Sequence, residues 1–467
     1  MVPRMERQKG DASLSWRQKA WKVFDELSLV FGVLTALVWC FLNYESWSNL
    51  VNYEIFHGSK WFGHAHVDAE GAVHYSITVG YVVTGVLLSL TFFTDVGIEL
   101  KEFVLDKVGK WGEVLSPFAG TAGGVIGPML VYVSFCTFFV VWAEMNRGVI
   151  AVTATDIALA LFLLKRFFGP GHAIIGFAMI LAVADDGVGL AFIGIFLSKG
   201  SVGLWWLLSF SIALAVGIIG GRVFRIQHPL FYFVFSVVPC WLCFQVSGLE
   251  PALGAVIGAF AMPTGKEGGV FDAEELERSV KHDPGYDKAG NRFKAWVHAP
   301  KVVVLFAFGF VACGVPMTAA SFNVATLIFS ASLFIGKTFF IFGLTVAAHY
   351  GLSWLPEWKV FTWLRLHKIR ARLAEGVTFR ELFAGSIACS VGCTVALFMI
   401  NATWSEGWML DGARLGSVLS LPVGWFMLWL LQRLTGPFRR FETKEAWSAA
   451  VEALSDPVEV TPEPLAV

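Results

Sequence analysis

The chain has 467 residues, of which 56% are hydrophobic and only 15% are charged, and its mean hydropathy is +0.65. A soluble domain of this length cannot bury so much apolar surface, so the composition excludes an ordinary soluble protein. The formal net charge of −1 indicates no partner by itself. The sequence shows no phosphate-binding glycine loop, nucleophile elbow or nucleic-acid motif, so we expect no enzyme, no cofactor and no nucleic-acid partner.

The apolar residues form about twelve segments, most of which approach the ~20 residues that a bilayer-spanning helix needs. In chain order they are residues 26–43, 77–98, 115–142, 149–165, 172–198, 203–221, 228–247, 250–263, 300–317, 323–348, 382–402 and 414–432. A membrane β-barrel would instead show alternating strands of ~10 residues. The sequence therefore predicts an all-α polytopic membrane protein.

The basic residues predict the orientation of these helices. With the N-terminus inside, the Lys and Arg residues fall on the cytoplasmic side, apart from Lys337 within a span and from Lys60, Arg147, Lys199 and Arg414. This asymmetry follows the positive-inside rule. The predicted organisation is a cytoplasmic segment 1–25, a transmembrane domain 26–434 and a cytoplasmic tail 435–467. Within the domain lie an external loop 44–76 and a cytoplasmic loop 264–299.

The external loop contains a predicted β-hairpin. The stretch AHVDAEGAVHY (65–75) has two short alternating runs on either side of Asp-Ala-Glu-Gly. This pattern is typical of two antiparallel strands joined by a turn. We expect the hairpin to lie outside the membrane, between the first two spans.

Four ionisable residues lie deep within apolar spans: Asp156, Asp185, Asp186 and Lys337. Each costs ~2.5–3.5 kcal/mol to insert, so such residues persist mainly where they pair or line an aqueous cavity. A structural ion pair that fixes helix register is the alternative explanation. Three acids and one base cannot pair off neutrally, which favours a functional site.

Adjacent residues on a helix point ~100° apart, so Asp185 and Asp186 cannot both face one partner. One can pair with Lys337 while the other faces a water-filled funnel, where lost solvation and a like-charged neighbour favour its protonated form. Carboxylate oxygens suit hard cations such as Na⁺ or Li⁺, so a proton and the cation compete for the same atoms. We hypothesise that this competition couples their movements, with a desolvated Lys337 as a second proton carrier.

Two spans contain clusters of polar or small residues that indicate broken helices. In VTATDIALAL (152–161), Thr153, Thr155 and Asp156 interrupt an apolar run with side chains that compete for backbone hydrogen bonds. The span 382–402 has a comparable cluster at Ser386, Ser390, Gly392 and Thr394. Matching interruptions in two halves are typical of inverted-repeat transporters, although small residues also serve close helix packing.

Seven motifs occur in an order that resembles NhaA-type sodium/proton antiporters. They are FFTDVGIELKE (92–102), ATDIALAL (154–161), LAVADDGVGL (181–190), SGLEPALGAVIGAFAMP (247–263), ACGV (312–315), IGKTFF (335–340) and VGCTVALF (391–398). The resemblance implies a twelve-helix electrogenic exchanger of the bacterial inner membrane, with two interrupted helices that cross. It also implies a homodimer formed through the external hairpin 62–75.

The same resemblance assigns roles to individual residues. It implies that Asp185 and Asp186 carry the cation and protons, and that Lys337 pairs with Asp185. Thr155 and Asp156 would support the crossing helices. Glu99 matches an acid of the cytoplasmic funnel, and Glu277 matches a loop acid of the pH-sensing region.

Several positions depart from the family pattern. Glu250 stands where the family has a histidine linked to pH response, Glu102 and Phe103 replace an Arg-Glu pair, and Asp95 is an additional acid. Asp95, Glu99 and Glu102 share one helix face. They form either a cation-attracting mouth or an ordinary solvated helix end.

The leading hypothesis is therefore an antiporter that exchanges cytoplasmic Na⁺ (or Li⁺) for external protons. One alternative keeps the fold but carries an organic anion by ion-coupled symport. The other alternative is a non-transporting membrane sensor. The altered pH-sensing positions argue for this alternative, whereas the intact buried charges argue against it.

Overall fold

The structure is a computed structural model that describes residues 15–59, 62–67, 73–107, 111–192, 194, 203–264, 288–351, 373, 376–404 and 406–455. Within these residues, ten helices are long and apolar enough to cross a membrane. They are Trp16–Val51, Val79–Val104, Leu115–Phe138, Ala173–Phe192, Leu204–Val223, Pro229–Ser247, Ala289–Ala312, Val324–Tyr350, Phe379–Thr403 and Trp408–Thr435. A bent pair, Trp142–Thr153 and Ile157–Phe168, makes an eleventh crossing.

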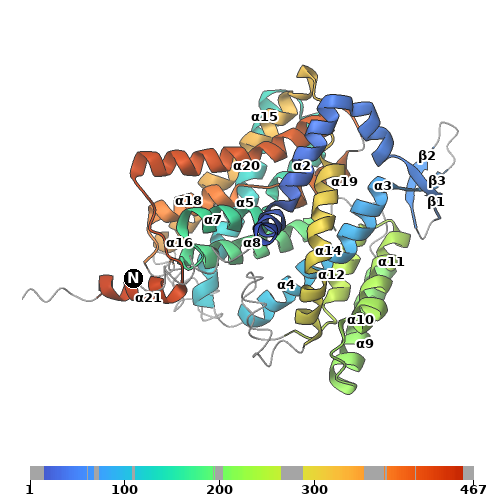
Figure 1. The fold of residues 1–467 in the computed structure, drawn as a ribbon, viewed down its shortest axis with the longest axis horizontal. Helices are drawn as coiled ribbons and strands as arrows, with labels where there is room; N and C mark the ends of the chain where they lie inside the picture. The colour runs from blue at the N-terminus through green and yellow to red at the C-terminus, as the bar shows by residue number, and fades with distance from the viewer. Residues whose placement is uncertain are drawn as a thin grey trace, which may run out of the picture.

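The prediction of an all-α polytopic membrane protein is confirmed, and each predicted apolar segment contains helix (Figure 1). The segment 250–263 forms only the nine-residue helix α12 (Pro251–Ala259). A helix of nine residues rises only about 14 Å, roughly half of the hydrocarbon thickness. This short helix accounts for the difference between the predicted spans and those of the structure.

The first half of the chain contains the elements α2 (Trp16–Val51), β1 (Glu54–His57), β2 (His64–Val67), β3 (Val73–Thr78), α3 (Val79–Tyr81), η1 (Val82–Phe93), α4 (Thr94–Lys107), α5 (Trp111–Phe138), α6 (Trp142–Met145), η2 (Asn146–Thr153), α7 (Ile157–Phe168), α8 (Ala173–Phe192), α9 (Gly203–Val216) and η4 (Gly217–Val223). The helix η2 is a 3₁₀-helix, whereas η1 and η4 are π-helical stretches that continue a neighbouring α-helix. The helix α2 is longer than the predicted span 26–43 because its backbone kinks at Leu27 and Asn43 and then resumes the helix.

The second half contains α10 (Pro229–Tyr232), η5 (Phe233–Val237), α11 (Val238–Ser247), α12, α14 (Ala289–Ala312), η6 (Ala319–Ser321), α15 (Val324–Ala331), η7 (Ser332–Lys337), α16 (Thr338–Gly351), α18 (Phe379–Cys389), α19 (Thr394–Thr403), α20 (Trp408–Thr435) and α21 (Lys444–Ser455). The π-helical η7 joins α15 to α16 and ends at Lys337. Short π-helical segments are frequent at functional sites.

The predicted hairpin is confirmed, with one strand more than expected. Strands β2 and β3 pair in antiparallel fashion, with His66 opposite His74. Strand β1 pairs with the other edge of β3, which gives a three-stranded sheet of order β1-β3-β2. In Figure 1 the sheet projects from one edge of the protein, and α21 lies at the opposite edge.

The helices α5 and α16 pack through their backbones, and this contact fixes the position of Lys337. A Cβ atom at Gly123 would lie 2.2 Å from the carbonyl oxygen of Phe340, and one at Gly127 would lie 2.4 Å from that of Gly336. Only glycine permits such an approach, as is common between membrane helices. The π-helical turn that carries Lys337 is therefore pressed against α5.

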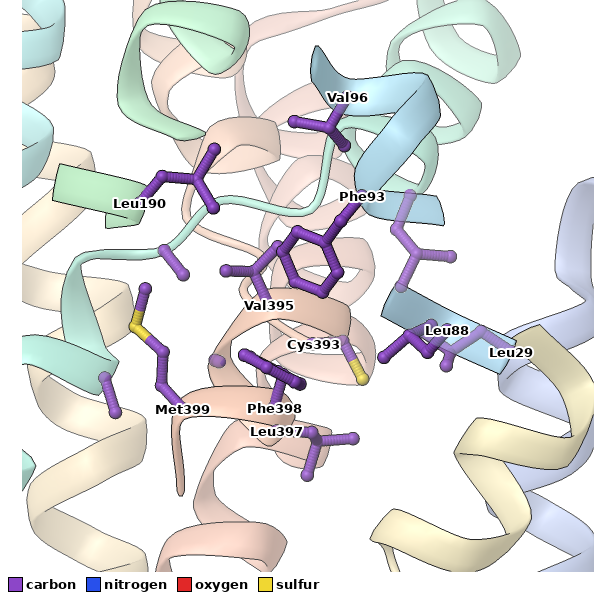
Figure 2. Close-up of a cluster of buried hydrophobic side chains, with 14 of the residues drawn as sticks. Leu29, Leu88, Phe93, Val96, Leu190, Cys393, Val395, Leu397, Phe398 and Met399 are labelled. Atoms are coloured by element: carbon purple, nitrogen blue, oxygen red, sulfur yellow. The ribbon is translucent and has the colours of Figure 1, made fainter. Parts of the chain in front are cut away.

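The span Phe379–Thr403 is the most enclosed of the spans. Its second half, α19, packs against η2, α20 and α14. The ring of Phe398 in α19 also lies 4.9 Å from that of Phe93 in η1 (Figure 2). Leu88 and Val395 belong to the same buried apolar cluster. Burial on all sides explains why this span consists almost entirely of apolar and small residues.

Candidate functional site

Two helices are interrupted, and their breaks lie in contact. The first break, at residues 154–156, separates η2 from α7, and the two helical pieces meet at 53°. The second, at residues 390–393, separates α18 from α19. The backbone N–H of Asp156 donates to the carbonyl of Val391 at 2.8 Å. A Cβ atom at Gly392 would lie 2.6 Å from the carbonyl oxygen of Ala154. The prediction of two interrupted, crossing helices is confirmed.

Asp156 links the two breaks through its carboxylate. Its Oδ1 accepts from the backbone N–H of Leu159 at 3.0 Å and so caps the N-terminus of α7. Its Oδ2 accepts from the backbone N–H of Thr394, at the start of α19, at 3.0 Å and also from the Thr394 hydroxyl. A negative charge therefore lies between the positive ends of two helix dipoles. This arrangement stabilises a buried carboxylate for which the described residues provide no ion-pair partner.

We expect Asp156→Ala to lower the free energy of unfolding by about 3 kcal/mol, since one N-cap and two charge-assisted hydrogen bonds are lost. Asp156→Asn keeps an oxygen that can cap α7, so it should cost less. Thermal unfolding of the purified protein in detergent measures both changes. Equal stability of the alanine variant and the wild type would contradict this role.

Asp185 and Lys337 form a fully buried ion pair. Lys337 Nζ lies 3.0 Å from Asp185 Oδ2, and neither side chain is accessible to solvent. Lys337 also donates to the hydroxyl of Thr155 at 2.6 Å, and that hydroxyl donates to Asp185 Oδ2 at 2.5 Å. Thr155 belongs to the first break, so the ion pair is tied to the crossing point.

The side chain of Asp186 takes no part in the hydrogen bonds of the Asp185–Lys337 pair. It is only 5% exposed, and no hydrogen bond of its side chain is found within the described residues. Its Oδ1 and the Oδ1 of Asp185 are both buried without a protein donor in that part of the chain. The charged groups that act on Asp186 are Asp185, Asp156, Glu99 and Lys337. The structure thus brings the predicted acids together, and neither oxygen of Asp186 nor Oδ1 of Asp185 has a hydrogen-bond donor among the described residues.

Glu99 lies beside this group on α4. The helix α4 passes next to Asp186, because a Cβ atom at Gly187 would lie 3.2 Å from Leu100. The other two acids of the same face are paired with lysines of α14. Glu102 lies 2.6 Å from Lys294, and Asp95 contacts Lys301. The interpretation as an ordinary solvated helix end is wrong, since Asp95 is buried and the Glu102 side chain is 11% exposed.

Sequence reasoning missed these two ion pairs, although a signal for them exists. Asp95 and Glu102 are seven residues apart, and so are Lys294 and Lys301. Seven residues are about two helical turns, so the two acids lie on one side of their helix and the two lysines on one side of theirs. When the two helices run antiparallel, the equal spacing lets both acid–lysine pairs form at once.

The two remaining predicted residues lie away from the cluster or outside the described structure. Glu250 immediately precedes α12. The far end of α12 contacts α4, where a Cβ atom at Gly97 would lie 2.8 Å from the carbonyl oxygen of Val256. Six residues of helix separate Glu250 from that contact, a rise of about 9 Å. Glu277 lies outside the described residues, as does most of the loop 264–299.

Two interrupted helices that cross, with buried carboxylates at the crossing, are typical of ion-coupled secondary transporters, a class of which NhaA is a known example. Residues 24–428 match the family model described as Na+/H+ antiporter 1, and the chain belongs to this family. The family performs sodium/proton exchange, which favours neither the organic-anion symporter nor the non-transporting sensor.

Individual relatives agree with this assignment. The chain is 28% identical over 416 residues to the Na(+)/H(+) antiporter NhaA of Jannaschia sp. (strain CCS1), a match that covers 84% of this chain and 92% of the relative. It is 28% identical over 405 residues to the NhaA of Geotalea uraniireducens (strain Rf4), with 85% and 92% covered. It is 29% identical over 401 residues to NhaA 2 of Pelobacter propionicus, with 84% and 91% covered. All three carry the names of antiporters and not of enzymes.

Proposed function

We propose that the chain is an electrogenic antiporter that moves cytoplasmic Na⁺ (or Li⁺) outward and external protons inward, with Asp186 as the principal binding residue. The single observation that carries this proposal is the buried Asp186 carboxylate, which has no protein hydrogen bond within the described residues and lies beside Asp185. The proposed roles are sodium and pH homeostasis in a bacterial inner membrane, with both chain termini in the cytoplasm.

Competition for the same oxygens provides the coupling. Two adjacent carboxylates in a buried site repel one another when both are ionised, so the site favours either a proton or a cation. Asp185 Oδ1 and both oxygens of Asp186 have no hydrogen-bond donor among the described residues and are the atoms that would bind Na⁺. A hard monovalent cation prefers such ligands. Sodium therefore leaves the site when protons arrive, and protons leave when sodium arrives.

Lys337 supplies the second proton. When Na⁺ binds to Asp185, it weakens the contact between this carboxylate and Lys337. A buried ammonium that loses its counter-charge favours its neutral form. Two protons then move inward for each Na⁺ outward, so one net positive charge enters per cycle. The membrane potential contributes about 2.3 kcal/mol per 100 mV to such a cycle.

We expect Na⁺ and Li⁺, but not K⁺, to collapse an imposed pH gradient in everted vesicles between pH 6 and 9. In proteoliposomes, an inside-negative potential should accelerate sodium efflux, since each cycle brings net positive charge inward. Vesicles without the protein are the control. If none of the three cations changes the pH gradient, the proposed exchange is contradicted. If the rate of sodium efflux does not depend on the membrane potential, only the proposed stoichiometry is contradicted.

Glu99, Glu250 and Glu277 are proposed to shape access and pH response. The pairing of Asp95 and Glu102 with lysines supports Glu99 as the funnel acid, since no ion pair of Glu99 is found among the described residues. Basic residues in the segments 1–25 and 435–467 support their cytoplasmic placement. The transmembrane domain would then comprise residues 26–434, with its external loop at 44–76 and its cytoplasmic loop at 264–299.

The hairpin 62–75 is proposed to mediate a homodimer. Strand β2 (His64–Val67) belongs to this hairpin and is an edge of the three-stranded sheet. Exposed edge strands offer unpaired backbone groups to a second chain. We expect deletion of residues 62–75 to convert a dimer into a monomer by light scattering while exchange persists. A deletion variant that stays dimeric would contradict this interface.

A further inference from the structure

The chain continues beyond the matched residues 24–428 with a segment that folds back onto the transmembrane domain. After α20 ends at Thr435, residues 436–443 run without helix to α21. We call residues 436–447 the C-terminal clamp. The clamp includes the first turn of α21, which in Figure 1 lies at the edge of the protein opposite the β-sheet.

The clamp pairs with the turn between α7 and α8 through its backbone. The N–H of Phe441 donates to the carbonyl of Phe168 at 2.9 Å, and the N–H of Gly171 donates to the carbonyl of Phe441 at 2.9 Å. The turn has glycine where the clamp passes. A Cβ atom at Gly171 would lie 2.2 Å from the backbone of Thr443, and one at Gly169, where φ is +80°, would lie 2.3 Å from the Phe441 carbonyl oxygen.

Aromatic rings extend this contact. The ring of Phe438 lies 4.5 Å from that of Phe168, and the indole of Trp447 lies 4.3 Å from the imidazole of His172. His172, Phe438 and Trp447 are all buried. Such ring pairs contribute beyond the apolar area that they bury. The clamp is therefore packed against the turn like part of a core.

The same segment binds the start of α18 through a charged pair. Arg439 donates from Nε to Glu381 Oε1 at 2.8 Å and from Nη2 to Glu381 Oε2 at 2.6 Å. Glu381 is 3% exposed and also completes the capping box of α18 with Thr378. His172 Nε2 lies 3.3 Å from Glu381 Oε1. One buried carboxylate thus joins the clamp, the α7–α8 turn and α18.

The charge of Arg439 is permanent. Its hydrogen bonds to Glu381 raise the pKa of the guanidinium above an ordinary value that is already high. Bidentate pairs of this kind fix geometry as well as charge. A lysine at this position could make only part of the contact.

The helices that the clamp joins are the ones that carry the crossing point. α7 begins directly after Asp156, and α18 ends at Cys389, whose carbonyl oxygen lies 3.3 Å from the hydroxyl oxygen of Thr155. Each helix is a rigid rod of about 16–18 Å. The clamp binds the end of each helix that lies farther from the break. By fixing these two ends, it constrains the position at which the breaks meet.

From this arrangement we infer that Arg439 and Trp447 are positioning residues for exchange: they hold α7 and α18 so that Asp156, Thr155 and the Asp185–Lys337 pair keep their relative positions. The inference rests on the proposed function and extends it. It predicts an effect on sodium affinity from residues that touch neither the cation nor the breaks. Displacements of about 1 Å at a binding constellation can cost two orders of magnitude in efficiency.

The test compares Arg439→Gln with Arg440→Gln in the full-length chain in proteoliposomes. Arg440 is the matched control, because its pair with Glu442 is about half exposed. We expect the apparent KM for Na⁺ to rise about tenfold in Arg439→Gln, to recover partly in Arg439→Lys and to stay unchanged in Arg440→Gln. A purely structural role would lower the amount of protein or its melting temperature and leave KM unchanged.

Each outcome decides the matter. An unchanged KM in Arg439→Gln, beside normal exchange by the wild type, overturns the inference and leaves the proposed function intact. If the wild type shows no Na⁺-driven exchange, both the inference and the proposed function are overturned. If Arg439→Gln does not reach the membrane, Trp447→Leu replaces it, with the half-exposed Trp429→Leu as control. Equal KM values in that second pair also overturn the inference.

Discussion

Asp186→Asn abolishes sodium-driven proton exchange. We expect the flux to fall below about 1% of wild type, because an amide neither titrates in this range nor carries the charge that a cation needs. The native carboxylate has no protein hydrogen bond within the described residues, so its replacement removes no stabilising contact there. The folded protein should therefore persist, and its melting temperature should match or exceed that of the wild type, since one buried acid has been neutralised.

The measurement is the Na⁺-dependent change of internal pH in proteoliposomes that contain equal amounts of protein. Glu45→Gln, at an exposed position of α2, makes the same carboxylate-to-amide change away from the site and should leave exchange unchanged. Substantial exchange by the Asp186 variant would show that sodium and protons compete elsewhere.

Loss of either partner of the Asp185–Lys337 pair destabilises the protein. We expect Asp185→Asn or Lys337→Met to lower the free energy of unfolding by about 3–5 kcal/mol, because each leaves one uncompensated buried group. Neither side chain is accessible to solvent, so water cannot replace the missing partner. The double variant Asp185→Asn/Lys337→Met should lose much less than the sum, since no buried charge of the pair remains.

A double-mutant cycle by thermal unfolding in detergent measures this coupling. The pair Glu102–Lys294 offers a matched comparison, because its side chains are 11% and 14% exposed and water reaches both. The cycle Glu102→Gln with Lys294→Met should show the smaller coupling energy. Additive effects at Asp185 and Lys337 would mean that the two groups do not stabilise each other.

The charged residues of the site could be predicted because insertion into an apolar span is costly in free energy, so each such residue signals a special environment. Asp156, Asp185, Asp186 and Lys337 were found in this way, and the structure places all four together. The break near Thr155 was also predictable, since hydroxyl and carboxylate side chains within an apolar helix compete for backbone groups.

The partners of these residues were less predictable from sequence alone. Asp156 binds Thr394, which lies 238 positions away along the chain. Thr394 belongs to the polar cluster that indicates a break in its span, but its pairing with Asp156 depends on how the two breaks meet in space, which no local pattern shows. The docking of the C-terminal segment was missed for a similar reason: Arg439 looks like an ordinary basic residue of a tail until Glu381 is seen opposite it.

The backbone contact between α5 and α16 has a consequence for how the transporter moves. Since carbonyl groups abut glycines at Gly123 and Gly127, there is no layer of side chains between the two helices that could deform. The backbone that carries Lys337 and the helix α5 are therefore expected to move as one rigid unit during transport. A conformational change that displaces the Lys337 backbone would then bend the protein outside this pair of helices.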